Sequence, residues 1–262
     1  TASNNTAVGG YALSANTTGT YNTAVGKSAL EDNTTGTNLN AFGNQALANN
    51  TTAHNNCAFG EAALQDNTTG TNLAAFGAFA LKDNTTANNN NAFGYYSQYA
   101  TTTGTGNTSC GSVTLYANTT GNYNVAIGLD SLKANTTGSN NVGIGYKSLT
   151  TITTGQRNTA VGSESLDVCT GNDNTAFGLS AGGSSTSGSE NTFIGRSAGG
   201  NSTTGDENIC IGYDAQTSSA TVDGECVLGS SDIGTLRCNT QTISALSDQR
   251  DKTEIIDLPI GL

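Results

Sequence analysis

Residue types that could support covalent or metal chemistry are few in this sequence. Its 262 residues include six cysteines and one histidine, and no Cys-x-x-Cys pair or Cys/His spacing typical of a metal site occurs. Charge is concentrated in the last sixteen residues, SDQRDKTEIIDLPIGL, which contain six charged side chains, whereas the rest of the chain is polar and sparsely charged. Any chemistry is therefore expected in this C-terminal segment, and no cofactor or metal site is predicted.

The composition excludes several classes of protein. With 9 Lys and Arg against 20 Asp and Glu, the net charge is −11, and the chain lacks the basic clusters that displace counterions from nucleic acid. No apolar run approaches the roughly 18 residues of a membrane-spanning helix, so membrane insertion is not expected. Only 34% of the residues are apolar, which is too few for a thick core but sufficient for a thin, regularly packed one.

The elements that must position these residues follow from an internal repeat. A glycine ends the segment NTAVG, and equivalent glycines recur at intervals of 17 residues, with a single interval of 16. We call them the corner glycines: Gly9, Gly26, Gly43, Gly60, Gly77, Gly94, Gly111, Gly128, Gly145, Gly162, Gly178, Gly195, Gly212 and Gly229. A fixed short period along a chain indicates one structural unit per repeat, stacked on its neighbours.

Each position in the unit has a physical role. An apolar residue precedes every corner glycine, leucine usually follows four residues after it, and asparagine stands four residues before it in most repeats. Segments such as NTAVG alternate like short strands, and glycine permits a tight turn. A helical repeat is the competing interpretation, but two turn signals per unit leave room for only about one helical turn. We therefore predict an all-β protein, a parallel β-solenoid or β-roll of about 14 coils.

Two expectations concern packing. A single thin coil buries little apolar area, so association of chains is expected, and the phenylalanines before corner glycines in the first half suit an interface between them. Between Gly178 and Gly212 the leucine column changes to glycine, in SAGG at 180–183 and again at 197–200. This change predicts a narrowing of the roll.

The repeats resemble the heads of trimeric autotransporter adhesins and, more closely, the NTAVGxxAL…NTTGxxNTAVG arrays of phage and algal-virus fibre proteins. The resemblance covers about residues 4–230. It implies a left-handed β-roll assembled as a homotrimer at the virion surface, where it would attach to a carbohydrate or protein receptor on the host. A bacterial trimeric surface adhesin of the same architecture is the alternative. The NTTG turn makes this unit longer than the usual adhesin-head coil.

The threonine pairs and the histidine also have ordinary structural interpretations. A Thr-Thr pair repeats in nine consecutive coils, from Thr17-Thr18 to Thr153-Thr154. Threonine ladders on solenoids can match ice, so thermal hysteresis would test ice binding, but adjacent threonines beside glycine are also common turn formers. His54 has no nucleophile or metal ligand at a recognisable spacing, so an exposed, inert histidine is predicted.

The cysteines are predicted to be mainly buried thiols. Cys57, Cys110, Cys210 and Cys226 all fall in strand segments, where small apolar residues are usual. Cys57 and Cys110 are three coils apart, which is too far for a disulfide. Cys210 and Cys226 lie on adjacent coils but one position out of step, so their side chains should face opposite ways. From spacing alone, an interchain bridge through Cys169 or Cys238 remains open.

The C-terminal segment resembles the start of the self-cleaving intramolecular chaperone of phage tailspikes and fibres, a match carried by Ser247, Asp248, Arg250, Lys252 and Ile255. The resemblance implies that Lys252 deprotonates Ser247, whose hydroxyl attacks the Leu246–Ser247 peptide bond. This would be a single self-cleavage, so no enzyme acting on an outside substrate is expected. The alternative is an ordinary helix start, with Ser247 as N-cap.

We therefore predict three regions: a β-roll over 1–230, an extended connector over 231–246, and the start of a truncated chaperone over 247–262. The family's chaperone is longer, and the sequence has no initiating methionine, so we expect the chain to be a segment of a longer polypeptide.

Overall fold

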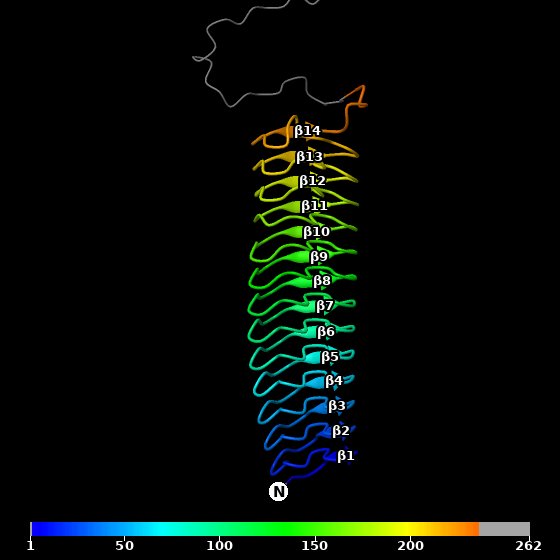
Figure 1. The fold of residues 1–262 in the computed structure, drawn as a ribbon, viewed down its shortest axis with the longest axis vertical. Helices are drawn as coiled ribbons and strands as arrows, with labels where there is room; N and C mark the ends of the chain where they lie inside the picture. Colours follow the sequence, from blue (N-terminus) through cyan, green and yellow to red (C-terminus); the bar gives the residue numbers. More distant parts are fainter. Residues whose placement is uncertain (1, 236–262) are drawn as a thin grey trace, which may run out of the picture. The chain divides into compact units, whose positions relative to one another are not determined.

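A computed structural model describes residues 2–235, and these residues form a single parallel β-sheet of fourteen short strands. Each strand pairs with the next one in the sequence, and the strands stack like rungs (Figure 1). The strands are β1 (Thr6–Val8), β2 (Thr23–Val25), β3 (Asn40–Phe42), β4 (Cys57–Phe59), β5 (Ala74–Phe76), β6 (Asn91–Phe93), β7 (Thr108–Cys110), β8 (Val125–Ile127), β9 (Val142–Ile144), β10 (Thr159–Val161), β11 (Thr175–Phe177), β12 (Thr192–Ile194), β13 (Ile209–Ile211) and β14 (Cys226–Leu228). The prediction of a parallel β-solenoid with a 17-residue repeat is confirmed.

The single interval of 16 residues leaves the strand register unchanged. Thr159 of β10 pairs with Thr175 of β11, just as equivalent positions 17 residues apart pair elsewhere. The coil between them contains Cys169-Thr170-Gly171 at the turn where several other coils have Asn-Thr-Thr-Gly, so the turn is one residue shorter. The shorter turn does not change the strand register, because the turn lies outside the paired strands.

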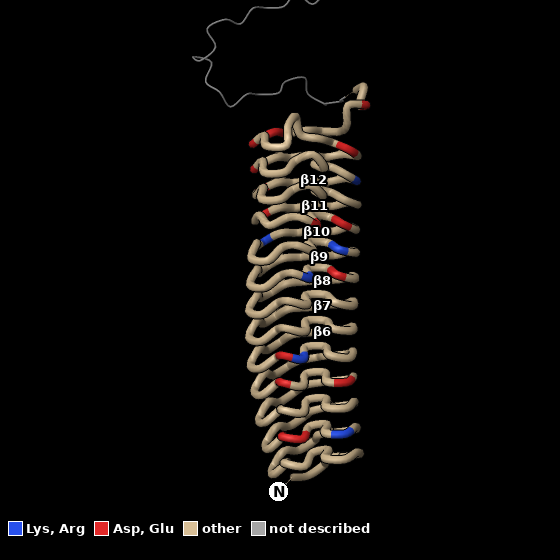
Figure 2. Tube along the Cα trace, viewed as in Figure 1, with Lys and Arg blue, Asp and Glu red and all other residues tan. Residues whose placement is uncertain are grey.

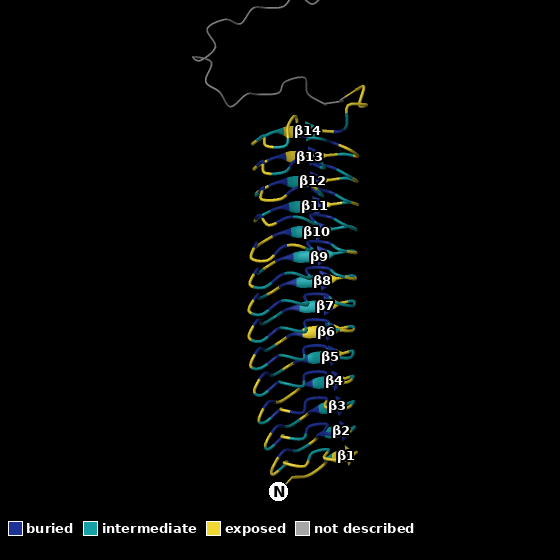
Figure 3. Cartoon of the chain, viewed as in Figure 1, coloured by how far each residue is buried: buried dark blue, intermediate teal, exposed yellow. Residues whose placement is uncertain are grey.

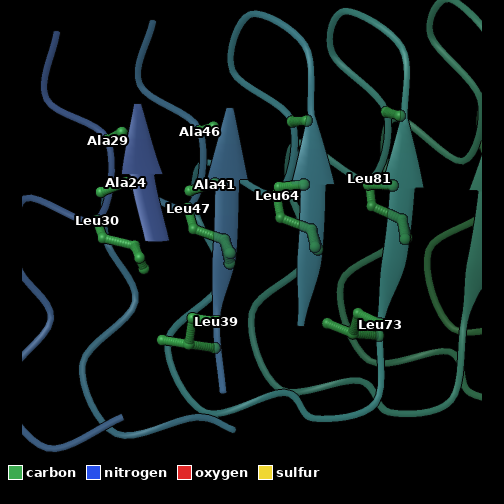
Figure 4. Close-up of a cluster of buried hydrophobic side chains, with 14 of the residues drawn as sticks. Ala24, Ala29, Leu30, Leu39, Ala41, Ala46, Leu47, Leu64, Leu73 and Leu81 are labelled. Atoms are coloured by element: carbon green, nitrogen blue, oxygen red, sulfur yellow. The ribbon is translucent and has the colours of Figure 1, made fainter. Parts of the chain in front are cut away.

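The core is a column of small and branched apolar side chains. In Figure 4, Ala24 and Ala41, at the centres of β2 and β3, and the leucines four residues after the corner glycines stack on their equivalents in the next coil. Ala41 and Leu47 are fully buried, whereas the exposed residues, such as Thr35, lie along the outside of the turns (Figure 3). Thin coils can therefore be held together by burial of about one leucine and two alanines in each.

The core leucines have an unusual backbone conformation. Leu30, Leu47 and Leu64 have φ between 52° and 53°, in the left-handed region that side chains normally avoid. Their amides nevertheless donate to the next coil, as in the 3.0 Å bond from the Leu47 amide to the Ala63 carbonyl, and their carbonyls accept within the same coil, as Leu47 does from the Asn50 amide at 3.2 Å. Packing and these bonds therefore offset the local strain in each coil.

Buried asparagines form hydrogen bonds to backbone groups at the glycine of the Asn-Thr-Thr-Gly turn and at the residue that precedes each strand. Asn124, four residues before a corner glycine, donates from Nδ2 to the Gly138 carbonyl at 2.9 Å. Its Oδ1 accepts the Asn141 amide of the next coil, also at 2.9 Å. Leu39, Leu73 and Glu225 replace this asparagine in three coils, but their own amides still bond to the asparagine of the preceding coil. The predicted asparagine column is thus a hydrogen-bonded ladder along the solenoid.

A second buried ladder, formed by the asparagines of the Asn-Thr-Thr turns, is interrupted at Thr101 and ends at Asn135. Asn67 donates from Nδ2 to Asn50 Oδ1 at 3.1 Å, and Asn84 donates to Asn67 in the same way. Thr101 and Ile152 occupy the equivalent positions after Asn84 and Asn135. The Oδ1 atoms of those two asparagines consequently have no hydrogen-bond partner.

Phe193 fills the core where the leucine column is lost. Its ring is fully buried at the strand position that is alanine in most coils. A Cβ atom added to Gly182 would lie 2.6 Å from this ring, and one added to Gly199 would overlap the ring still more closely. Between Gly178 and Gly212, where a narrowing was predicted, one large ring thus occupies the core beside the two glycines that replace leucine.

The chain divides into two compact units, Thr1–Ser231 and Asp232–Leu262. The solenoid belongs to the first, and its last strand, β14, ends at Leu228. Of the second unit, the structure describes only residues 232–235.

Candidate functional site

The predicted self-cleavage residues Ser247 and Lys252, and the Leu246–Ser247 bond, lie outside the described residues. The surface features that the structure does place are those of the solenoid. Three sides of each coil differ in chemistry: the outward side of the strands, the Asn-Thr-Thr turn, and the segment that follows the corner glycine.

An apolar stripe follows the outward side of the strands. It consists of the residues that precede the corner glycines: Val8, Val25, Phe42, Phe59, Phe76, Phe93, Cys110, Ile127, Ile144, Val161, Phe177, Ile194, Ile211 and Leu228. The exposed fraction is 42% for Phe93 and 51% for Leu228, although both are large apolar residues. The four consecutive phenylalanine rings stack at centroid distances of 4.6–5.1 Å. The stripe thus extends over all fourteen coils.

The thiols are less uniformly buried than predicted. Cys169 and Cys210 are buried, but Cys57 is half-buried, and Cys110 and Cys226 are exposed because their strand positions face outward. Burial raises the pKa of Cys169 to about 11, which disfavours the reactive thiolate. The opposite orientation predicted for Cys210 and Cys226 is confirmed, since Cys226 pairs with Ile209 rather than with Cys210. Cys238 lies outside the described residues.

The two threonines of each pair have different roles. The hydroxyl of the first donates to a carbonyl of the next coil, as Thr34 does to Thr51 at 3.0 Å. The second, such as Thr35, is exposed and forms the outermost row of the turn. A further threonine, two residues after the second one, completes a Thr-x-Thr pattern only at Thr20, Thr37, Thr71 and Thr105. The turn thus presents one continuous row of exposed threonines.

His54 is exposed, as predicted, and has a structural role. Its Nδ1 accepts the Thr37 amide at 3.0 Å, in the way that Asn88 Oδ1 accepts the Thr71 amide at 2.8 Å. His54 therefore takes the place of an asparagine such as Asn88 as hydrogen-bond acceptor between neighbouring turns.

The segment after the corner glycine contains aromatic and charged residues that most repeats lack. Five aromatic side chains on three consecutive coils form an aromatic cluster: Phe79, Tyr95, Tyr96, Tyr99 and Tyr116. Lys82 lies beside them, with Nζ 3.0 Å from both Asp66 and Asp83 and 5.7 Å from the centroid of the Tyr99 ring. Burial acts to lower the pKa of Lys82, but its hydrogen bonds to Asp83 and Asp66 outweigh burial and raise it. Lys82 therefore stays charged and forms ion pairs with both carboxylates.

Beneath the aromatic cluster the core becomes polar. Gln98 replaces the core leucine and is fully buried; its Nε2 donates to the Asn91 carbonyl at 2.8 Å and to Ser109 Oγ at 2.9 Å. Ser97 bonds to Ser109 and Thr114. Gln98 Oε1 has no partner. These bonds tie the coil of β6 to that of β7, and they separate the two apolar core clusters.

A hollow of about 270 Å³ lies on the same side of later coils, where glycines remove the side chains found elsewhere. It is lined by Glu164, Asp167, Ser180, Gly183, Ser184 and Gly200. Burial, with the nearby charge of Glu164, raises the pKa of Asp167. The hollow offers hydrogen-bond acceptors and hydroxyls.

Charged side chains are sparse along the solenoid (Figure 2), and several of them form ion pairs, such as Arg157 with Asp173 at 2.6 Å. Within residues 2–235, no group of three His, Cys, Asp or Glu side chains is placed to hold a metal ion. The same residues include no helix long and apolar enough to cross a membrane.

Comparison with protein-family models, with curated proteins and with solved structures gives no match for this chain. Sequence reasoning identified the apolar stripe but missed the aromatic cluster. The available signal was the recurrence of aromatic residues two and five positions after the corner glycine in neighbouring repeats, at Phe79 and Tyr96 and at Tyr99 and Tyr116.

Proposed function

We propose that this solenoid is the shaft or head of a homotrimeric virus or phage fibre that attaches to a host surface. The apolar stripe carries the proposal. Soluble monomers rarely expose a continuous apolar patch of this extent, and such patches mark interaction surfaces. The stripe belongs to one parallel sheet, and its register in the strands does not change from β1 to β14. A closed assembly of parallel copies would bury it along its whole length.

The phenylalanine segment of the stripe is expected to contribute most to assembly, because aromatic rings bury the largest apolar area. Changing Phe42, Phe59, Phe76 and Phe93 together to threonine should convert a trimer into monomers. Threonine suits strands, so each chain should still fold. Native mass spectrometry and sedimentation would measure the oligomeric state. Tyr21→Asn with Tyr123→Asn, two exposed tyrosines on the turn side, provides the control that should remain trimeric.

Cys110 gives the same experiment a second readout, because it lies within the stripe and is exposed in the single chain. In the trimer its thiol should be protected from a labelling reagent, and in the threonine variant it should react. Buried Cys169 should stay unlabelled in both. Monomeric wild-type protein with a reactive Cys110 would contradict the proposed assembly.

We further propose that the fibre matures by cleavage between Leu246 and Ser247. Ser247→Ala, introduced into the polypeptide as its source produces it, should abolish cleavage, because the nucleophilic hydroxyl is removed. Intact mass would reveal chains ending at Leu246 in the wild type and uncut chains in the variant. Ser244→Ala, just before the cleavage site, is the matched control and should be cut normally. Uncut wild-type chains would favour the helix-cap interpretation of Ser247.

A further inference from the structure

We propose that the aromatic cluster and its ion-paired rim form a binding site for a neutral carbohydrate chain. The proposal rests on the proposed attachment function and names the ligand class of that function. Four rings of the cluster, Phe79, Tyr96, Tyr99 and Tyr116, stand two or five residues after a corner glycine, whereas every residue of the apolar stripe stands directly before one. Tyr95 lies two residues after Phe93, at the border between the stripe and the cluster. The cluster therefore extends beyond the residues of the stripe.

The rings form one continuous surface. Phe79 and Tyr96 stack at 4.9 Å with an interplanar angle of 14°, and Tyr99 and Tyr116 stack at 5.3 Å with an angle of 10°. Tyr95 stands across the first pair, at 78° to Tyr96, and 52% of it is exposed. The stacked rings thus support one another, while Tyr95 keeps ring surface free for a ligand.

The rim supplies polar partners. Lys82 bridges Asp66 and Asp83, and the side chains of these aspartates remain 36% and 34% exposed. A carboxylate accepts several hydrogen bonds, so each retains acceptor capacity beyond the bond to Lys82. The four tyrosine hydroxyls add groups that both donate and accept. Because the lysine offsets much of the carboxylate charge, the site favours a ligand rich in hydroxyls over a strongly charged one.

The site is also preorganised. Gln98 bonds to Ser109 and Ser97 bonds to Thr114, and these bonds fix the coil that carries Tyr95, Tyr96 and Tyr99 against the coil that carries Tyr116. Rigid supports reduce the conformational entropy lost on binding. A sugar ring has an apolar C–H face that can pack on Tyr95, and hydroxyls at its edge that can bond to the rim. These complementary features identify the occupant as a carbohydrate.

The test uses the double variant Tyr95→Ser/Tyr96→Ser. Serine already occupies the equivalent positions at Ser112 and Ser28, so the coil should fold unchanged. Tyr146→Ser is the matched control, because Tyr146 follows a corner glycine directly, as Tyr95 does, and is exposed outside the cluster. The probes are immobilised glucan, mannan, galactan and β-1,4-linked N-acetylglucosamine oligomers, with binding followed by biolayer interferometry. Tyrosine fluorescence offers a direct second signal, since the chain has no tryptophan.

We expect the wild type and Tyr146→Ser to bind at least one of these neutral glycans, and the double variant to bind it at least tenfold more weakly. Failure of the wild type to bind any of them, or equal binding by the double variant, would overturn the proposal. Oligomeric state separates this result from the fibre proposal. A trimer that binds no glycan overturns only the carbohydrate site, whereas a monomer that binds through the cluster overturns only the fibre assembly.

Discussion

Replacing Gly60 with alanine is expected to disrupt the solenoid between β4 and β5. The φ of Gly60 is +138°, a conformation that residues with a side chain rarely adopt. An added Cβ would lie 2.5 Å from the Gly77 carbonyl oxygen and 2.6 Å from the Gly77 carbonyl carbon. Both are backbone atoms of the next coil, so the coils would have to separate. We expect a loss of more than about 4 kcal/mol in the free energy of unfolding.

Thermal and denaturant unfolding would measure this effect, and limited proteolysis would show whether the chain opens near the substitution. Gly10→Ala is the matched control, because no heavy atom lies within 4 Å of its added Cβ. Its unfolding midpoint should be close to that of the wild type. Similar stability of the Gly60 and Gly10 variants would show that coil contact at the corner glycines is not limiting.

Truncating Phe193 should open the largest cavity available from a single core change. The ring is fully buried and occupies the space beside Gly182 and Gly199, so Phe193→Ala leaves glycines around an empty volume. Phenylalanine-to-alanine changes in cores typically cost about 3–5 kcal/mol. We expect a loss in that range in denaturant unfolding.

Restoring the leucines should rescue this variant. Leucine is the usual residue at the positions of Gly182 and Gly199, where it adopts the same left-handed conformation, as Leu149 does with φ of 52°. In the wild type each added leucine would collide with Phe193, so Gly182→Leu/Gly199→Leu alone should destabilise the protein. Combined with Phe193→Ala, the same two changes should recover most of the lost stability. Additive losses in the triple variant would contradict the exchange of one ring for two leucines.

The repeat pattern predicted much of this fold because each signal is local. The corner glycines adopt positive φ, the short strands lie before them, and the asparagines bond along the stack, as the sequence indicates. The left-handed leucines could not be predicted, because leucine has no intrinsic preference for this conformation; contacts with neighbouring coils impose it. Phe193 was missed for a related reason: its partners, Gly182 and Gly199, lie in different repeats.

The exposure of strand residues and the contacts between surface side chains were harder to predict than the core. An alternating strand pattern does not say which side faces the interior when both sides carry apolar residues, so Cys110 and Cys226 were predicted to be buried although they are exposed. The aromatic cluster depends on ring contacts between coils, and only the three-dimensional stack brings Tyr96 against Phe79 and Tyr116.

The direction of the backbone hydrogen bonds determines how the solenoid responds to force. They connect each coil to the next, so a pull on the two ends of the solenoid loads thirteen strand-to-strand contacts in series. The weakest contact should open first, and each released coil of 17 residues would add roughly 50 Å of extended chain. Tension would then be relieved in similar steps, coil by coil, rather than by one rupture. A chain anchored at one end and attached at the other could thereby lengthen under drag and remain bound.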